Sequence, residues 1–264
     1  VTGHSARIIT NKALDWLKNR DPEKPFLLCA QYKTPHIHRL PPPNRMGGYD
    51  DHEFPVPDTF FDDFSTRSSF VSKTWMALKG MKGHVLNVAP TKKEIEANPE
   101  IRPPFLREMT PRQRDAWHEA YDPRNLRFRK MKEEGKLEGK EAQLHVYQRF
   151  IKDYVRCIDG LDDQVGRILS FLDETGLSKN TLVIYSSDQG FFTGEHGWAE
   201  KRWMYEESFK SPLLMRWPRV IKPGTRISAL VQNIDLAPTL IRAAGLTIPE
   251  SVHGLALQPL LSGK

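Results

Sequence analysis

The sequence lacks the features of several specialised protein classes. Only two cysteines, Cys29 and Cys157, occur among the 264 residues, which excludes a small disulfide-stabilised scaffold. No apolar run approaches the roughly 18 to 20 residues that a membrane-spanning helix needs. There is no internal repeat, no low-complexity tract and no charged-then-apolar leader at the first residues. What remains is a chain long enough to bury a large core, as an α/β domain of this size does.

The net charge of the sequence is also small. The sequence has 39 Lys and Arg against 33 Asp and Glu, which leaves a net charge of +6. This balance favours anionic partners only weakly, and a solvated basic face is the simpler explanation. The basic residues are densest at 124–140, a stretch that we expect to be exposed. Nothing in the sequence indicates binding to nucleic acid or insertion into a membrane.

Helical and extended patterns alternate along the chain. Apolar residues recur at three- and four-residue steps over about 141–174, which predicts one long helix with a single apolar face. Short apolar runs at 25–32 and 181–187 predict buried strands, and an irregular proline-rich excursion covers about 39–63. The expected fold class is α/β, with a mostly parallel, mixed sheet between layers of helices. The other expected elements are helices at 5–19, from 110 onward and at 235–244, and strands at 212–217 and 228–232.

The expected strand at 181–187 leads into a glycine-jointed loop with polar side chains. Asp188 and Gln189 come directly after the strand, and His196 and Lys201 follow in the same loop. Ligand sites in open α/β sheets lie at the carboxyl ends of strands. Carboxylate and amide oxygens suit calcium or magnesium better than zinc, and a lysine ammonium holds an anionic oxygen. The loop therefore suggests a shared site for a metal and an anion, although a capped strand end would also explain the acid and the amide.

A second polar group follows the expected strand at 25–32. Lys33 and His36 are joined by a turn that Pro35 fixes. Because the carboxyl ends of parallel strands meet at one edge of a sheet, we expect both side chains to face the same pocket as the first group. Two alternatives stay open. His36 and His38 could be loop histidines without a role, or a zinc or copper site for which no third ligand lies nearby.

Several motifs together resemble the type I sulfatases of the alkaline-phosphatase-like superfamily. The resemblance rests on PFLL at 25–28 with KTPH at 33–36, and on SDQG at 187–190 with GEHG at 194–197. It covers nearly the whole chain, is thinner over about 40–140, and is closest to bacterial sulfatases similar to N-acetylglucosamine-6-sulfatase. No single motif is specific, but the set is highly so. The further matching motifs are KR at 201–202, YE at 205–206, PLL at 212–214, NIDLAPT at 233–239 and GLALQPLL at 254–261.

The resemblance implies a sulfuric ester hydrolase with an alkaline-phosphatase-like fold. Asp188 and Gln189 would be two of four protein ligands to one calcium ion, with magnesium as an alternative. Lys201 would hold a sulfate oxygen and help neutralise the leaving group, and His36 would contact the ester and could protonate the departing alcohol. A metal and a cation together stabilise charge that develops on the sulfuryl oxygens.

The resemblance also implies how the substrate is held and where the enzyme works. The expected substrate is a sulfated carbohydrate or another sulfate ester, and bacterial sulfatases of this type are often periplasmic or secreted. Any export signal would precede Val1, so the chain itself does not fix the location. The residues expected to bind the substrate are Lys33, His196 and Arg202.

One departure from the family pattern concerns the nucleophile. Family members make a formylglycine from the cysteine or serine of a C-x-P-x-R signature, which neither Cys29 nor Cys157 matches. The other two metal-binding aspartates precede that signature in the family and are missing too. The acidic pairs at 62–63 and 162–163 are tempting replacements, but both are better interpreted as structural. The chain is therefore expected to lack turnover by itself.

These departures give the expected domain organisation. Residues 1–264 would form a partial sulfatase catalytic domain, incomplete at the N-terminus and without the C-terminal subdomain, and residues 40–140 would be a family-specific insertion. Two other functions remain possible at this point. One is a phosphatase or phosphodiesterase of the same superfamily, against which Gln189 argues because those sites use histidine ligands for paired zinc. The other is a non-catalytic chain that binds anionic glycans through Lys33, Lys201 and the basic stretch 124–140.

Overall fold

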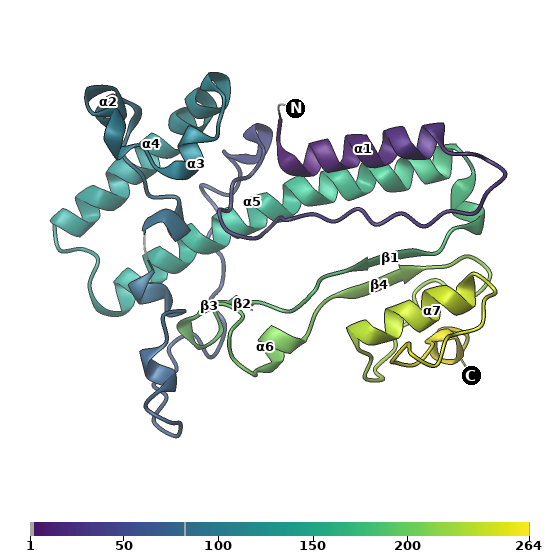
Figure 1. The fold of residues 1–264 in the computed structure, drawn as a ribbon. Helices are drawn as coiled ribbons and strands as arrows, with labels where there is room; N and C mark the ends of the chain where they lie inside the picture. Colours follow the sequence, from purple (N-terminus) through teal and green to yellow (C-terminus); the bar gives the residue numbers. More distant parts are fainter. Residues whose placement is uncertain (1–2, 82, 264) are drawn as a thin grey trace.

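A short sheet lies between two groups of helices in the computed structural model, which describes residues 3–81 and 83–263. Strands β1 and β4 pass between the long helix α5, with α1 beside it, and the small helix α7 (Figure 1). The α-helices are α1 (Ser5–Asn19), α2 (Lys92–Ala97), α3 (Pro104–Arg107), α4 (Pro111–Glu133), α5 (Gly139–Glu174), α6 (Glu206–Phe209), α7 (Leu236–Ala243) and α8 (Gln258–Leu261). The strands are β1 (Val183–Ser186), β2 (Phe192–Thr193), β3 (Ala199–Glu200) and β4 (Leu213–Arg216). The 3-10 helices are η1 (Pro43–Arg45), η2 (Val71–Lys73), η3 (Leu78–Gly80), η4 (Gly83–Leu86), η5 (Pro99–Ile101), η6 (Leu177–Asn180), η7 (Glu195–Gly197) and η8 (Asn233–Asp235).

Helix α5 is the element around which the others are arranged. Its 36 residues confirm the long helix predicted from apolar spacing, and Gly176 ends it in the left-handed conformation at φ 71°. Gly160 lets the η1 segment approach closely, since a Cβ at this position would lie 2.5 Å from Cδ of Pro42. The helix therefore fixes both α1 and the loop that follows the first extended segment.

The sheet differs from the mostly parallel one that we expected. Among the described residues, β1 pairs with β4 and β2 pairs with β3, and both pairs are antiparallel. The predicted strand at 212–217 is confirmed as β4, and the one at 181–187 as β1. The connection from β1 to β4 has about 26 residues and contains β2, η7, β3 and the short helix α6, so it reverses the chain without a long crossover helix.

Two expected strands do not form. Residues 25–32 are extended and alternate between more and less exposed side chains, but no backbone hydrogen bond joins them to the described part of the chain. Residues 228–232 are also irregular, and Leu230 is 92% exposed. A strand needs a neighbour to receive its backbone hydrogen bonds, and within the described residues neither segment has one.

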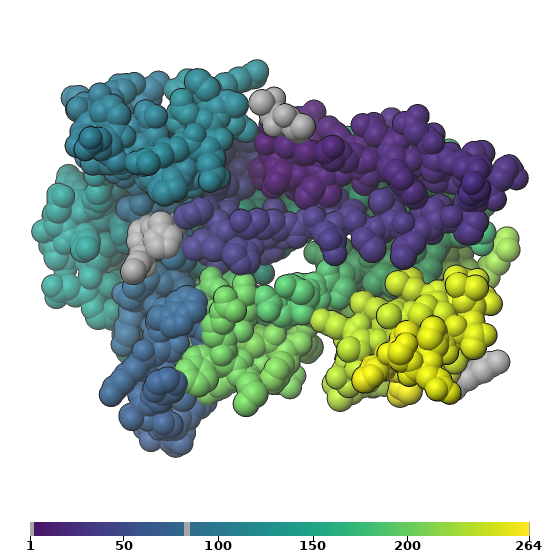
Figure 2. Space-filling model, viewed as in Figure 1, coloured from purple at the N-terminus to yellow at the C-terminus, as the bar shows by residue number. Residues whose placement is uncertain are grey.

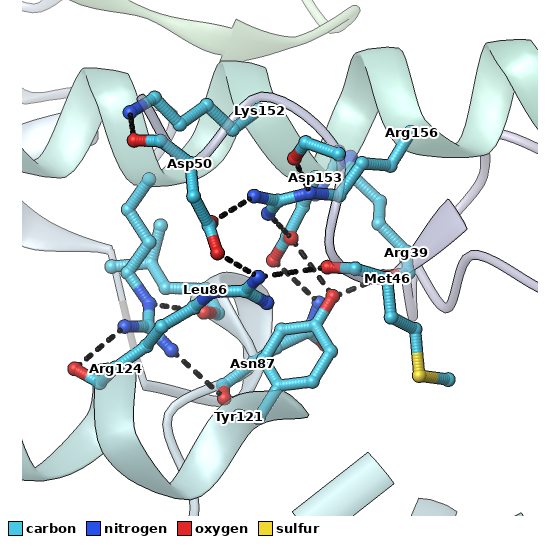
Figure 3. A network of polar contacts seen from close by, with 12 residues as sticks. Arg39, Met46, Asp50, Leu86, Asn87, Tyr121, Arg124, Lys152, Asp153 and Arg156 are labelled. Atoms are coloured by element: carbon cyan, nitrogen blue, oxygen red, sulfur yellow. Dashed lines mark hydrogen bonds and ion pairs between the residues drawn. The ribbon is translucent and has the colours of Figure 1, made fainter. Parts of the chain in front are cut away.

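The excursion after residue 39 is held to α5 by a buried polar network (Figure 3). Asp153, only 3% exposed, accepts hydrogen bonds from the Tyr121 hydroxyl at 2.8 Å, from Nδ2 of Asn87 at 2.8 Å and from Arg156 at 2.7 Å. Arg156 also pairs with Asp50 at 2.6 Å. Buried polar groups satisfied in this way specify one arrangement of the segments that carry them.

Most of the basic stretch 124–140 is exposed, as expected, but helix α4 uses part of it in ion pairs. The helix expected from 110 onward is confirmed, and it begins with a capping box in which the Thr110 side chain accepts from the N–H of Gln113. Within the basic stretch, Arg124 pairs with Asp50 at 2.6 Å and Arg129 with a carboxylate of α2 at 2.9 Å. Asn125 is fully buried. Arg124 thus joins α4 to the excursion, and Arg129 joins α4 to α2.

Candidate functional site

Five of the seven predicted site residues line one large cavity. Its volume is about 1870 Å³, and it lies between the extended segment 25–32, the apolar face of α5, strand β1 and helix α7. The two segments that deliver the polar residues end at the same cavity, as expected for strand ends in an α/β sheet. The predicted residues that line it are Lys33, His36, Asp188, Gln189 and Lys201.

The end of β1 is fixed by contacts from two other parts of the chain. The Asn233 side chain donates to the carbonyl of Asp188 at 2.9 Å, and the Ser187 hydroxyl donates to the Asp188 carboxylate at 3.2 Å. Gly190 donates its N–H to the Ser208 carbonyl at 2.9 Å. A Cβ at Gly190 would lie 2.2 Å from the carbonyl oxygen of residue 207, so only glycine fits here. The acid and the amide are therefore presented from a rigid strand end.

Lys201 lies in a small set of buried charges. Its side chain is 7% exposed, and its Nζ is 3.8 Å from the carboxylate of Glu200 and 5.6 Å from the ring centre of Phe191. The other oxygen of Glu200 is 3.5 Å from the Arg39 guanidinium. Burial lowers the pKa of Arg39, and Glu200 opposes that effect. Two cations share one carboxylate, so the set keeps a net positive charge that suits an anionic ligand.

The sequence pattern gave no indication of Arg39 or Glu200. Arg39 is 1% exposed and stacks over the rings of Phe150 and Phe191, with centroid distances of 4.9 and 5.3 Å. Glu200 has φ 92°, a conformation that non-glycine residues rarely adopt. An unusual backbone angle directly before Lys201 is visible only in three dimensions.

A hydrogen bond fixes the tautomer of the His36 imidazole. Its Nδ1 donates to the carbonyl of Ile37 at 2.9 Å, because a carbonyl oxygen can only accept. A neutral His36 therefore carries its proton on Nδ1, which leaves the lone pair on Nε2. The side chain is exposed at the cavity, where a substrate oxygen could reach it.

His196, which the resemblance assigns to substrate binding, does not line this cavity. It is 7% exposed, its Nδ1 donates to Asp62 at 2.7 Å, and its backbone N–H donates to the Thr59 hydroxyl at 3.2 Å. The rings of Trp198 and Tyr205 lie 5.4 and 5.0 Å from its own. Asp62, 134 residues earlier in the chain, thus draws the histidine into an aromatic layer.

Arg202 also lies away from the cavity lining. Its side chain is exposed, while its backbone N–H contacts the Met76 sulfur at 3.3 Å.

The acidic pairs at 62–63 and 162–163 were considered as metal ligands, but Asp62 and Asp163 form hydrogen bonds and ion pairs instead. Although burial would raise the pKa of Asp62, hydrogen bonds from Arg67, from the N–H of Phe64 and from His196 lower it to about 2. Asp163, in α5, pairs with Arg45 at 2.6 Å. In the described part of the chain, no group of three or more His, Cys, Asp or Glu side chains could hold a metal ion. The alternative zinc or copper site at His36 and His38 has no such group either.

Several known proteins are similar to this chain in sequence. Residues 194–264 match the family model described as "N-sulphoglucosamine sulphohydrolase, C-terminal". The N-acetylglucosamine-6-O-sulfatase of Bacteroides thetaiotaomicron is 35% identical over 99% of this chain and 47% of its own length. The human N-acetylglucosamine-6-sulfatase is 40% identical over 39% of this chain and 19% of its own length.

A solved structure gives the same result in three dimensions. The structure of BT4656 "in complex with its substrate D-Glucosamine-2-N, 6-O-disulfate" has a TM-score of 0.93 and 35% identity to this chain. The match covers 99% of this chain and 53% of that one. The chain spans about half the length of the Bacteroides thetaiotaomicron sulfatase and of BT4656.

The resemblance to type I sulfatases is thereby confirmed along nearly the whole chain, and with it the alkaline-phosphatase-like fold of those relatives. Two of the sulfatases that it is similar to are named for N-acetylglucosamine-6-sulfate. Within the described residues, no helix is long and apolar enough to cross a lipid bilayer.

Proposed function

We propose that this chain provides part of the active site of a sulfatase that cleaves sulfate monoesters from carbohydrates. The observation that carries the proposal is the cavity itself, because its lining includes two of the predicted lysines, the predicted histidine, an acid and an amide from three separate segments. Similarity to sulfatases named for glucosamine sulfates supports a sulfated sugar as the substrate class. A positively charged cavity of this kind attracts an anionic ester.

Different side chains of this chain would have different roles at the sulfate group. Lys201, whose ammonium is buried beside Glu200, would hold a sulfuryl oxygen and stabilise the charge that develops there. Nε2 of His36, when protonated, would donate its proton to the departing alcohol oxygen. Lys33 would also bind the ester, because it lines the same cavity as His36. The exposed Arg202 would contact the part of an anionic substrate that lies outside the cavity. We assign His196 to the aromatic layer rather than to the substrate.

A divalent cation fits the donor chemistry only in part. The Asp188 carboxylate and the Gln189 amide are hard oxygen ligands of the kind that calcium or magnesium prefers. Calcium takes about six to eight oxygens, so two side chains do not make a site by themselves. We propose that they are half of a calcium site whose other ligands lie outside these 264 residues. When bound, the ion would neutralise sulfate oxygens.

The remaining parts of the active site would likewise come from elsewhere. The nucleophile belongs to a signature that is missing from this sequence. We therefore expect the 264-residue chain alone to have no turnover. In the assembled domain the sheet would be mostly parallel, residues 40–140 would be a family-specific insertion, and the enzyme would be periplasmic or secreted.

The proposal is tested with a chimera. This chain is fused to the part of the Bacteroides thetaiotaomicron N-acetylglucosamine-6-O-sulfatase that it does not match, and release of sulfate from N-acetylglucosamine-6-sulfate is measured. We expect turnover by the chimera, and a fall in kcat of about 100-fold or more for Lys201→Ala. Lys24→Ala is the matched control, because Lys24 lines the same cavity at the start of the extended segment. A folded chimera without turnover, or equal effects of the two substitutions, would refute the proposal.

A further inference from the structure

Three buried charged side chains lie next to one another beside the cavity. Glu200 is 7% exposed, and its two carboxylate oxygens lie 3.8 Å from Nζ of Lys201 and 3.5 Å from the Arg39 guanidinium. Lys201 lines the cavity, and Figure 2 shows the surface hollowed between the purple N-terminal segment and the yellow C-terminal part. Within the described residues, no other carboxylate lies at ion-pair distance from either cation. One carboxylate therefore serves two cations.

The backbone that carries Glu200 is fixed by contacts with two other segments. Glu200 ends β3 and is paired with Phe192 of β2. The N–H of Ala199 donates to the Met76 carbonyl at 3.0 Å, and the N–H of Arg202 lies 3.3 Å from the Met76 sulfur. At Glu200 itself φ is 92°, a value that favours glycine, so the surrounding contacts hold the residue there. An unfavourable backbone angle beside a side chain that lines the cavity is the kind of outlier that accompanies function.

Arg39 is held in place by aromatic rings and by its own backbone. Its guanidinium lies 4.9 Å from the ring centre of Phe150 and 5.3 Å from that of Phe191, and its carbonyl accepts from Nδ2 of Asn87 at 2.7 Å. The residue is 1% exposed, yet within the described part of the chain its Nε, Nη1 and Nη2 atoms have no hydrogen-bond partner. A buried cation in this position needs a counter-charge. Glu200 supplies it, so Arg39 fixes one side of the carboxylate.

We propose that Glu200 is a positioning residue that sets the charge and the direction of the Lys201 ammonium, and that Arg39 limits how strongly Glu200 does so. The carboxylate keeps Lys201 protonated, because an opposite charge within about 4–6 Å favours the charged form. Arg39 attracts the same carboxylate, so Lys201 is not fully neutralised and keeps the charge that pairs with a sulfate oxygen. The inference rests on the proposed function of Lys201 and adds two residues that act through it.

Two substitutions should therefore affect Lys201 in opposite ways. Glu200→Gln leaves two cations and no carboxylate, so Lys201 should lose its proton more readily. Arg39→Met removes the competing cation and keeps a long side chain between the two rings, so Glu200 should hold the Lys201 proton more strongly. If the three side chains only fill space, both substitutions should loosen the site and change Lys201 in the same direction.

The test measures the reactivity of Lys201 in the isolated chain. Acetic anhydride in trace amounts modifies only unprotonated amines, and mass spectrometry of the digested protein gives the rate at each lysine. At pH 8 we expect acetylation of Lys201 to be about tenfold faster in Glu200→Gln and about threefold slower in Arg39→Met than in the wild type. Lys24 is the internal standard, because it lines the same cavity and its carboxylate partner is Asp21. The rate at Lys24 should be the same in all variants.

Conservative substitutions separate the charge of these residues from their packing. Glu200→Asp keeps the carboxylate and Arg39→Lys keeps the cation, so both variants should react at Lys201 within about twofold of the wild-type rate. Urea unfolding shows which of the four variants fold. The pair at Glu200 and the pair at Arg39 each decide independently, so the test still holds if a member of one pair does not fold.

The chimera with the Bacteroides thetaiotaomicron sulfatase gives the consequence for sulfate release. Glu200→Gln should lower kcat by about 10- to 100-fold, because Lys201 is no longer directed at the sulfate. Arg39→Met should mainly raise KM, because a Lys201 that Glu200 neutralises binds an anionic ester less well.

The outcomes separate this inference from the proposed function. An unchanged rate at Lys201 in Glu200→Gln, or a change in the same direction in Glu200→Gln and Arg39→Met, would overturn the inference. Opposite changes that the conservative variants do not show would support it. If those opposite changes are seen while the folded chimera has no turnover, the coupling of the three charges is supported and the proposed function is refuted.

Discussion

At the scale of single residues, Asp62 should matter more for stability than its neighbour. Its carboxylate accepts from His196 at 2.7 Å and from the Phe64 N–H at 2.9 Å, and it also pairs with Arg67. Asp62→Asn leaves a buried histidine donor with a weaker acceptor, so we expect a loss of about 1–3 kcal/mol in urea unfolding. Asp63→Asn is the control, since the exposed Asp63 bonds only to residue 65. Equal losses would show that the pair with His196 contributes nothing specific.

The same carboxylate predicts a pH dependence. Hydrogen bonds lower the pKa of Asp62 from 3.8 to about 2 against the opposing effect of burial. A carboxyl with a depressed pKa contributes stability that is fully present above the unfolded pKa and is lost as the pH falls through the folded one. The stability difference between the wild type and Asp62→Asn should therefore be constant above pH 5 and shrink between about pH 4 and 2. A difference that persists at pH 2 would contradict the assignment.

The two cysteines should differ in reactivity. Burial raises the pKa of the Cys157 thiol, whereas Cys29 is exposed in the extended segment 25–32. The thiolate is the reactive form, so iodoacetamide at pH 8 should modify Cys29 and leave Cys157 intact in the folded chain. Mass spectrometry of the digested protein gives both extents, and urea provides the control in which both react. Early modification of Cys157 would show that α5 opens readily.

At the scale of elements, two glycines of α5 should respond oppositely to alanine. A Cβ at Gly160 would overlap Pro42, with 2.5 and 2.6 Å to its ring carbons, whereas a Cβ at Gly166 would meet nothing within 4 Å. Gly160→Ala should cost about 1–3 kcal/mol by overpacking. Gly166→Ala should stabilise the chain by about 0.5–1 kcal/mol, because alanine favours a helix. Urea unfolding of both variants tests this, and a stabilising Gly160→Ala would mean that η1 does not pack on α5 in solution.

The same scale shows which elements the sequence could predict. Helices α1 and α5 follow from apolar spacing and end signals, because a helix satisfies its own hydrogen bonds. Residues 25–32 have an equally clear apolar pattern but form no strand, since no neighbouring strand is present among the described residues. The convergence of Lys33 and Asp188 was predictable from strand ends. The burial of His196 was not, because it depends on Asp62, which is remote in sequence.

At the scale of the whole molecule, the response to calcium should report how complete the metal site is. The Asp188 carboxylate and the Gln189 amide offer two of the roughly six to eight oxygens that calcium needs, so binding by the isolated chain should be weak. A ligand raises the melting temperature only in proportion to its binding to the folded state. Millimolar calcium should therefore leave the Tm of the isolated chain almost unchanged, and Asp188→Asn should melt in the same way with or without the ion.

The chimera with the unmatched part of the Bacteroides thetaiotaomicron sulfatase should behave differently. If the added part supplies the remaining ligands, calcium should raise the Tm of the chimera, and Asp188→Asn should abolish that rise. Ser187→Ala is the matched control, because Ser187 contacts the Asp188 carboxylate through its hydroxyl but contributes no charge. A saturable calcium effect on the isolated chain would mean that these residues already form a site by themselves. An effect in the chimera that Asp188→Asn leaves intact would place the ion elsewhere, and the acid at the end of β1 would then have no role in binding it.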